Sequence, residues 1–260
     1  MSRRWAALAV IAFASLAGAP AAFADSTQSS NWAGYAVHRS GVHFTRVAGT
    51  WTQPKATCTR GQSTYSSMWV GVGGYDLSSQ ALEQIGTESN CDARGRPVYA
   101  AWYELVPAPS IPIRMTILPG DRISAAVVAQ GTEVTLQLTN ATRHVRVTRR
   151  VTVPEPDLTS AEWIAEAPSS CSPSGRCTGL PLANFGSVSF ARAAATGDAH
   201  AGTIADPAWQ ANVVELAELP QDGLDPRFTG RQPAPGSGAS PGPLSADGRG
   251  FAVAWHPATS

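Results

Sequence analysis

Residues 161–166 of this 260-residue chain read Ala-Glu-Trp-Ile-Ala-Glu, and they decide the fold class. Successive side chains of a β-strand point to opposite faces. The alternation therefore predicts a strand with one apolar face and one face that carries two carboxylates. The apolar face holds Ala161, Trp163 and Ala165. The opposite face holds Glu162, Ile164 and Glu166.

A second segment, residues 81–88, reads Ala-Leu-Glu-Gln-Ile-Gly-Thr-Glu. As a strand it places Leu82, Gln84, Gly86 and Glu88 on one face. A helix over residues 77–84, with Asp76 as N-cap, is the alternative, and we favour the strand for 82–88. A carboxylate and a neutral amide on facing strands would supply a general base and an oxyanion stabiliser. The pair suggests hydrolysis without Ser, Cys or metal.

The rest of the chain contains many short strand candidates separated by turn residues. Pro119-Gly120-Asp121 and Gln130-Gly131-Thr132 are candidate hairpin turns, and the alanine-rich residues 191–195 are a second helix alternative. The pattern predicts an all-β sandwich or jelly roll. The candidates are Asn31–Val37, Phe44–Thr52, Ser67–Val72, Tyr99–Val106, Arg114–Leu118, Arg122–Ala129, Glu133–Thr139, His144–Val153, Ala161–Ala165, Gly186–Ala191, Gln210–Leu216 and Phe251–Trp255.

The N-terminus has the features of a secretory signal peptide. Arg3 and Arg4 precede an apolar run, and Ala22-Phe23-Ala24 fits a cleavage site. The run is short for a transmembrane span. We therefore expect a secreted protein in which residues 25–260 form a single domain. We also expect a Pro/Gly-rich loop at 220–250, followed by a final strand at 251–256 whose apolar residues share one face.

Charge and composition exclude some partners. The chain has 19 basic and 19 acidic residues, and two of the basic ones lie in the signal peptide, so the mature chain carries a net charge of −2. No basic stripe is present, and we expect no nucleic-acid partner. We also expect a monomer, no cofactor, and no membrane association after signal removal.

Four cysteines in an exported chain indicate two disulfides. Three pairings exist in principle. Cys171 and Cys177 are close in sequence and enclose Pro and Gly, which favours that pair and leaves Cys58 with Cys91. A metal site is weakly supported, because no His stands at ligand spacing from any Cys.

Nothing local indicates the usual nucleophiles. The five histidines lie outside Gly-x-Ser-x-Gly and His-Glu-x-x-His contexts. A Ser-His-Asp triad assembled in space stays open. The strands hold unexpected carboxylates, at positions where acidic residues are poor strand formers. One alternative is a solvated sheet face; the other is a polar groove lined by aromatic residues. The carboxylates are Glu83, Glu88, Glu104, Glu162 and Glu166, with Gln84, Trp69, Trp102 and Tyr103 in similar strands.

Short segments in a fixed order suggest a family. They are Ser30-Asn31-Trp32-Ala33-Gly34, Trp69-Val70-Gly71-Val72-Gly73-Gly74, Leu82-Glu83-Gln84-Ile85-Gly86, Ala101-Trp102-Tyr103-Glu104, Pro119-Gly120-Asp121, Ala161–Glu166, and Cys171–Cys177 followed by Pro181-Leu182-Ala183-Asn184-Phe185. Each is weak alone, but their joint order and spacing over residues 29–219 resemble the glutamic peptidases, or eqolisins.

The resemblance implies a concanavalin-like β-sandwich of two curved antiparallel sheets, with a catalytic dyad of Gln84 and Glu166 on the concave face. It implies a secreted, acid-active endopeptidase that acts on polypeptides. Trp69, Glu88, Trp102 and Glu104 would bind substrate or support the dyad. The chain departs from the family pattern at Gly73, where an Asp is common, near Glu88, where an Asp is expected, and in the insertion at 220–250.

Three other functions remain open at this stage. A carbohydrate-binding module could stack sugars on its tryptophans, Trp32, Trp51, Trp69 and Trp102. A glycoside hydrolase could use two carboxylates, for example Glu104 and Glu166. A non-catalytic homologue could bind peptides without cleaving them.

Overall fold

The computed structural model describes residues 25–76, 79–171, 177–217 and 237–257. The expected signal peptide and residues 220–236 of the Pro/Gly-rich segment lie outside these ranges. Within them the chain forms strands and turns, and no helix is long and apolar enough to span a membrane. The strands are β1 (Asp25–Ser29), β2 (Trp32–His38), β3 (Phe44–Thr52), β4 (Ser67–Val72), β5 (Leu82–Cys91), β6 (Pro97–Val106), β7 (Ile111–Ile113), β8 (Arg122–Gln130), β9 (Glu133–Asn140), β10 (Val145–Thr152), β11 (Ser160–Glu166), β12 (Ser169–Cys171), β13 (Cys177–Gly179), β14 (Ser187–Gly197), β15 (His200–Gly202), β16 (Gln210–Leu216), β17 (Gly238–Pro241) and β18 (Phe251–His256).

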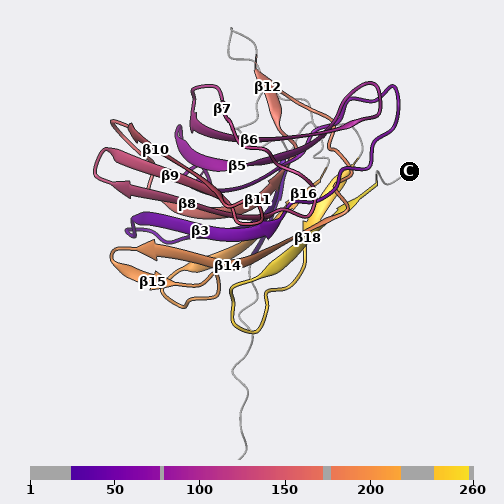
Figure 1. The fold of residues 1–260 in the computed structure, drawn as a ribbon. Helices are drawn as coiled ribbons and strands as arrows, with labels where there is room; N and C mark the ends of the chain where they lie inside the picture. The colour runs from indigo at the N-terminus through magenta and orange to yellow at the C-terminus, as the bar shows by residue number, and fades with distance from the viewer. Residues whose placement is uncertain (1–24, 77–78, 172–176, 218–236, 258–260) are drawn as a thin grey trace, which may run out of the picture.

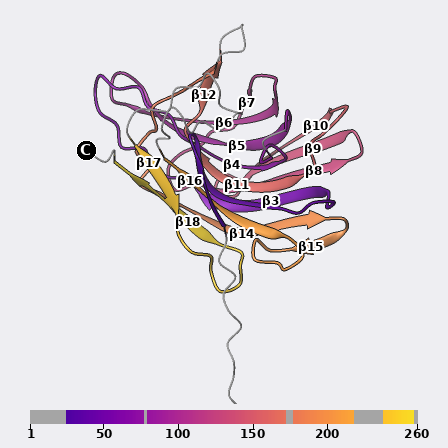
Figure 2. The ribbon, with the colours of Figure 1, turned by 180° about the vertical axis from the view of Figure 1, so that it is seen from behind.

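Sixteen strands form one continuous sheet that turns back on itself (Figures 1 and 2). Its order is β10-β9-β8-β3-β14-β18-β17-β16-β2-β11-β4-β5-β6-β7, with β1 and β15 attached at the side. Pairing is antiparallel except between β1 and β16. The two halves of the path form the layers of a sandwich, in which β4 and β5 pack on β8 and β9. The predicted all-β sandwich is confirmed.

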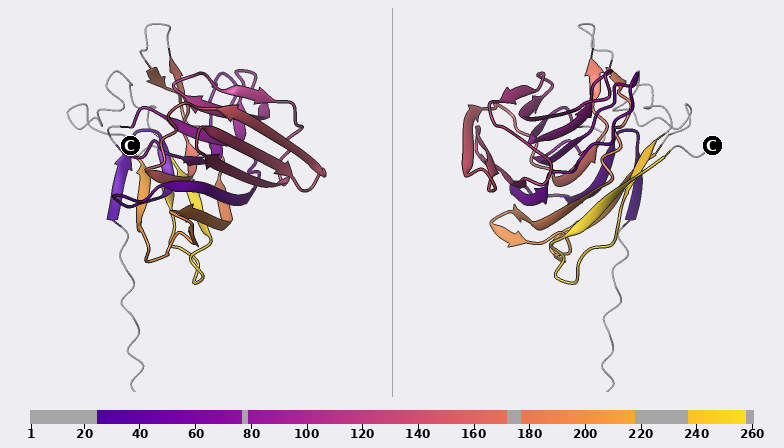
Figure 3. Two further views of the ribbon diagram at one scale, coloured as in Figure 1. Left: turned by 90° about the vertical axis from the view of Figure 1, so that its left-hand side faces the viewer. Right: turned by 45° about the vertical axis from the view of Figure 1, so that its right-hand side comes forward.

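An apolar core fills the space between the layers, and the strands curve around it (Figure 3). Trp163 of β11 is fully buried and donates its indole N–H to the Ala48 carbonyl of β3, at 2.8 Å. Trp51 of β3 donates to Thr87 Oγ1 of β5, at 3.0 Å. The face of residues 161–166 that alternation assigned to Trp163 is thus the core face. Trp51 belongs to the same core, so it cannot be an exposed sugar-stacking residue.

Most predicted strands are present, and both helix alternatives are wrong for the residues described. Residues 82–91 form β5, and residues 191–195 lie within β14. Gly131 takes a positive φ of 59° in the turn between β8 and β9, as the turn prediction required. The prediction of a Pro/Gly-rich loop over residues 220–250 is wrong in part, because β17 lies inside this range and pairs with β18. Phe251 and Val253 of β18 are buried in the core.

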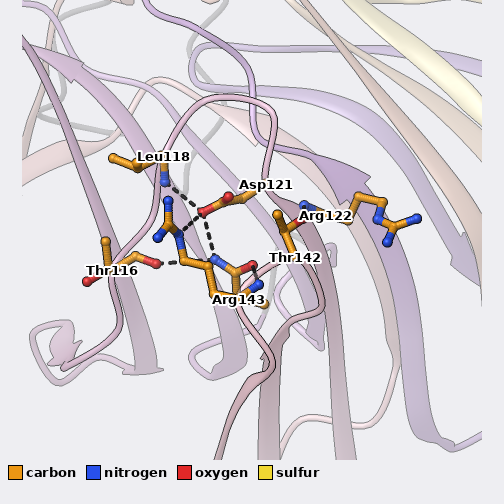
Figure 4. A network of polar contacts seen from close by, with 7 residues as sticks. Thr116, Leu118, Asp121, Arg122, Thr142 and Arg143 are labelled. Atoms are coloured by element: carbon orange, nitrogen blue, oxygen red, sulfur yellow. Dashed lines mark hydrogen bonds and ion pairs between the residues drawn. The ribbon is translucent and has the colours of Figure 1, made fainter.

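The predicted strand Arg114–Leu118 is also wrong; the strand in this region is β7. The backbone turns at Met115, whose N–H donates to the Ile113 carbonyl at 2.8 Å. Further along, Leu118 N–H donates to the Asp121 carboxylate at 2.9 Å (Figure 4). Hydrogen bonds with turns and side chains therefore replace a strand ladder here.

The Cys58–Cys91 disulfide ties the loop after β3 to the end of β5. The pair had been expected from the four cysteines, and it is confirmed. For the other pair, the register of β12 and β13 places Cys171 opposite Cys177. Their side chains are outside the described part of the structure, so that bridge remains a prediction.

Candidate active site

The second face of β2, β11, β4, β5 and β6, turned away from the inter-layer core, is here called the site face. A small apolar cluster covers it. Gln84 follows Leu82 on this face and Glu166 follows Ile164, as alternation predicted. The cluster consists of Trp32, Ala36, Trp69, Leu82, Trp102, Ile164 and Val214.

Glu166 is half-buried at the end of β11 and is held by two donors, one on β4 and one in the turn before β2. Trp69 donates its indole N–H to Glu166 Oε2 at 2.7 Å, and Asn31 donates its amide to Oε1 at 3.0 Å. Trp69 is itself fixed by an edge-to-face contact with Trp32, with ring centroids 5.0 Å apart. These two donors, which bind different oxygens, orient the carboxylate.

Sequence reasoning did not select Asn31 as a site residue. It lies just before β2, where Ser29 Oγ accepts the N–H groups of Asn31 and Trp32 and donates to Asn31 Oδ1, all at 3.1–3.3 Å. A Ser two residues before an Asn at a strand break is a local signal for such a turn. The turn fixes the Asn31 amide toward Glu166.

Gln84 is buried on β5, with 3% of its surface exposed. Its side-chain Nε2 donates to Glu104 Oε2 on β6 at 2.6 Å. Gln84 and Glu104 are also directly opposite each other in the ladder between β5 and β6. A carboxylate only accepts, so this contact fixes which end of the amide is the N–H₂. One N–H remains for another acceptor. Gln84 Oε1 is buried without a protein partner.

The strand register shows how Gln84 and Glu166 are related. Gln84 lies in one cross-strand row with Gly71 and Glu162, and Glu166 lies in another row with Ser67 and Glu88. The rows are four residues apart, about 13 Å along a flat strand. The Trp69 indole bridges the interval. Its N–H bonds Glu166, and its Cζ3 lies 3.0 Å from where a Cβ on Gly71 would stand.

The other residues predicted to support the dyad also lie on the site face. Glu88 accepts a hydrogen bond from Asn90 Nδ2 at 2.7 Å, and burial raises its pKa although this bond opposes the shift. Trp102 pairs with Gly86 and is 6% exposed, and its indole N–H has no protein partner. The site face therefore presents a buried donor, Trp102 Nε1, and a buried acceptor, Gln84 Oε1.

Residues 30–221 match the Peptidase A4 family. The chain belongs to this family, the eqolisins. It shares the fold of scytalido-glutamic peptidase bound to a peptide-based transition-state analogue (24% identity, TM-score 0.66, covering 87% of this chain and 98% of that one). It is also similar to aspergilloglutamic peptidase from Aspergillus niger (27% identity, TM-score 0.54, covering 74% and 99%). No curated protein sequence matches the chain.

Membership in the A4 family confirms that the chain is a glutamic-type peptidase, an enzyme class that hydrolyses peptide bonds and takes polypeptide substrates. It sets aside the carbohydrate-binding and glycoside-hydrolase alternatives. The pairing of Glu104 with Gln84, rather than with Glu166, is consistent with this outcome.

Two members of the predicted groove set, Glu83 and Tyr103, are misplaced. Tyr103 pairs with Ile85 and packs in the inter-layer core. Glu83 of this A4 peptidase lies on the core face of β5, between the backbones of Val72 and Leu105, and not on the site face. The family departure at Gly73 has a structural counterpart. A Cβ at Gly73 would stand 2.6 Å from the Cβ of Asp157, so Asp157 occupies the space of the absent side chain.

A pocket of about 580 Å³ lies beyond the end of β2, away from Gln84 and Glu166. His38, Arg39 and His43 line it together with Tyr75, which also packs on the apolar cluster of the site face. It thus borders the site face at Tyr75. In the described ranges, no three His, Cys, Asp or Glu side chains gather as a metal site.

Proposed function

We propose that this A4 peptidase is a secreted, acid-active endopeptidase in which Glu166 is the general base and Gln84 stabilises the oxyanion. The observation that carries the proposal is the pair of anchored groups on one buried face. Trp69 and Asn31 hold the Glu166 carboxylate, and Glu104 holds the Gln84 amide with one N–H unused. Residues 1–24 would direct export, and the Cys58–Cys91 disulfide fits an oxidising compartment.

The substrate would lie extended over Trp69, between the two groups. Support comes from the partnerless Trp102 N–H and Gln84 Oε1, which suit the alternating carbonyl and N–H groups of a peptide. The solved complexes of scytalido-glutamic peptidase and of SCP-B hold a peptide-based analogue and the tripeptide Ala-Ile-His, respectively. Trp32 and Trp102 would pack on the side chains of a similar ligand.

In the proposed reaction, the ionised Glu166 takes a proton from a water molecule, and the resulting hydroxide attacks the scissile carbonyl carbon. The carbonyl oxygen becomes an oxyanion and accepts the unused Gln84 N–H. The C–N bond then breaks as Glu166 returns its proton to the leaving nitrogen. Acidic conditions suit this cycle, because the same carboxyl must act in both forms.

The register favours a second candidate base, Glu162. It is fully buried and shares a row with Gln84, separated only by Gly71, which has no side chain. The family resemblance selects Glu166, whereas the register places Glu162 closer along the sheet. A test of function must therefore compare the two glutamates directly.

The test is an assay on denatured protein at pH 4 with Glu166→Gln, Glu162→Gln and Gln84→Ala. We expect Glu166→Gln to lower kcat by about 10²–10⁴ and Gln84→Ala by about 10²–10³, while Glu162→Gln keeps kcat within tenfold. Circular dichroism must show all three folded. Loss in Glu162→Gln with full turnover in Glu166→Gln would transfer the base role to Glu162. Wild-type turnover in both Glu166→Gln and Gln84→Ala would refute the dyad, and an inert wild type would support the non-catalytic alternative.

A further inference from the structure

Glu83 is a buried carboxyl that the proposed reaction does not use. Only 1% of its surface is exposed, and neither carboxyl oxygen accepts a hydrogen bond from another described residue. It precedes Gln84 on β5 and points to the opposite face. Its backbone neighbours in the ladder are apolar, Val72 on β4 and Leu105 on β6. A charge in such a place is costly unless it is paired.

Asp157, in the loop before β11, is the carboxylate nearest in the chain's contacts, because it binds Gly74, two residues after the Val72 that pairs with Glu83, and its charge raises the pKa of Glu83. It is anchored by three donors. Gly74 N–H donates to Oδ2 at 3.0 Å, Thr159 N–H donates to Oδ1 at 2.9 Å, and the Ser79 hydroxyl donates to Oδ2. Burial raises the pKa of Asp157, but these hydrogen bonds outweigh it and leave the pKa below the usual value. Asp157 is therefore the group that stays ionised.

The contacts of Asp157 join two segments of chain. Gly74 and Ser79 belong to the connection from β4 to β5, and Thr159 leads into β11. Gly73 has a φ of +83°, and any side chain there would collide with Asp157. Asp157 thus ties the entry to β5 to the entry to β11, the two strands that carry Gln84 and Glu166.

No cation offsets the two carboxyls among the described groups that act on Glu83. The other acidic residues of the two connecting segments, Asp76 and Glu155, are exposed. From the opposite layer, β8 and β9 direct apolar side chains into the core, including Val127 and Leu136. Burial, followed by the negative charge of Asp157, raises the pKa of Glu83 to about 8.

We propose that Glu83 and Asp157 form a proton-dependent lock that holds β5, and with it Gln84, against the loop before β11. The lock is closed while Glu83 is neutral. When Glu83 ionises, its buried charge is repelled by the half-buried Asp157 carboxylate, and the chain at Gly74 separates from Asp157. The lock goes beyond the proposed catalytic dyad, and it can be tested without substrate.

The sign of the effect follows from linkage. The pKa of Glu83 is higher in the folded chain, about 8, than its ordinary value of 4.5. Its contribution to stability is therefore complete below 4.5 and is lost as the pH rises toward 8. Over that interval the unfolding equilibrium constant should increase by up to about tenfold per pH unit.

The experiment measures thermal and urea unfolding of the secreted wild type and of Glu83→Gln from pH 4 to pH 9. Glutamine mimics the neutral carboxyl in size and shape. We expect equal stability at pH 4 and a much weaker alkaline decline in Glu83→Gln. Hydrogen exchange at pH 8 should show faster exchange over residues 73–91 in the wild type than in the variant.

Glu133→Gln is the matched control, because Glu133 is an exposed glutamate on β9; it should follow the wild type at every pH. Asp157→Asn removes the charge that helps to raise the pKa of Glu83, so the alkaline decline should be smaller than in the wild type and should end at a lower pH. An alkaline decline in Glu83→Gln as steep as that of the wild type would overturn the lock, whether or not the enzyme cleaves peptides. The lock would also be overturned if hydrogen exchange over residues 73–91 of the wild type, corrected for the intrinsic rate, were equally fast at pH 4 and at pH 8.

Discussion

Glu166 is positioned by side chains that are remote in sequence. Asn31 lies 135 positions before it, and Trp69 lies 97 positions before it. The Gln84 amide has a different anchor, Glu104. The two proposed reacting groups are therefore held by separate contacts, and a change in one support should leave the other group in place.

Asn31→Ala tests this separation. It removes the donor to Glu166 Oε1, while Trp69 still binds Oε2. A hydrogen bond to a charged group contributes about 1.5–3 kcal/mol, so kcat should fall by about ten- to a hundredfold with little change in KM. Asn31→Asp would place a second carboxylate beside Glu166 and should shift the pH–rate profile. Unchanged kcat and pH profile in both variants would show that Asn31 only shapes the turn before β2.

At this scale, sequence reasoning found some groups and missed others. Alternation and the family resemblance selected Gln84 and Glu166, because both lie in regular strands whose faces can be read from the sequence. Asn31 lies at a break between strands, where no periodicity operates. Asp157 replaces a side chain that is absent at Gly73, and only the folded chain brings these two positions together.

At the scale of elements, alternation predicted the long strands because one face of each packs on the core. It failed at Arg114–Leu118 for an identifiable reason. Ile113 and Ile117 are buried, with the partly buried Met115 between them, so the side chains alternate as in a strand. The backbone polar groups bond elsewhere: Asn140 Nδ2 donates to the Thr116 carbonyl at 3.2 Å. Burial periodicity alone does not require a ladder.

The Cys58–Cys91 bridge is the covalent link between the loop after β3 and strand β5. It joins positions 33 residues apart, and loop-closure entropy predicts a contribution of about 3–4 kcal/mol. Replacing both cysteines with serine should lower the free energy of unfolding by that amount in urea titrations. The same loop is also held by backbone bridges, Thr64 with Cys91 and Thr57 with Asn184. A loss below about 1 kcal/mol would mean that these bridges already restrict the unfolded chain.

At the scale of the whole molecule, two carboxyl groups in opposite layers limit stability at opposite ends of the pH range. Asp121 connects the start of β8 to the end of β9, where Asn140 and Arg143 donate to its Oδ2 at 2.8 and 2.7 Å. Burial raises its pKa, but these bonds and the Leu118 amide outweigh burial and lower it below 3.8. This stabilisation is complete above pH 3.8 and is lost as the pH falls through the folded pKa.

The pH dependences of Asp121 and of the Glu83 lock together predict that stability is greatest at acidic pH. The Asp121 contribution is complete above 3.8, and the Glu83 contribution is complete below 4.5, so Tm of the wild type should peak near pH 4 and fall on both sides. Asp121→Asn should weaken the fall of Tm below pH 4. Glu83→Gln should remove most of the fall of Tm above pH 4, and the fall that remains is due to Glu88. The two changes share no partner, so the double variant should show both effects additively. A wild-type maximum near neutral pH would contradict this account. A maximum near pH 4 would place greatest stability where a carboxyl that serves as both base and acid works best.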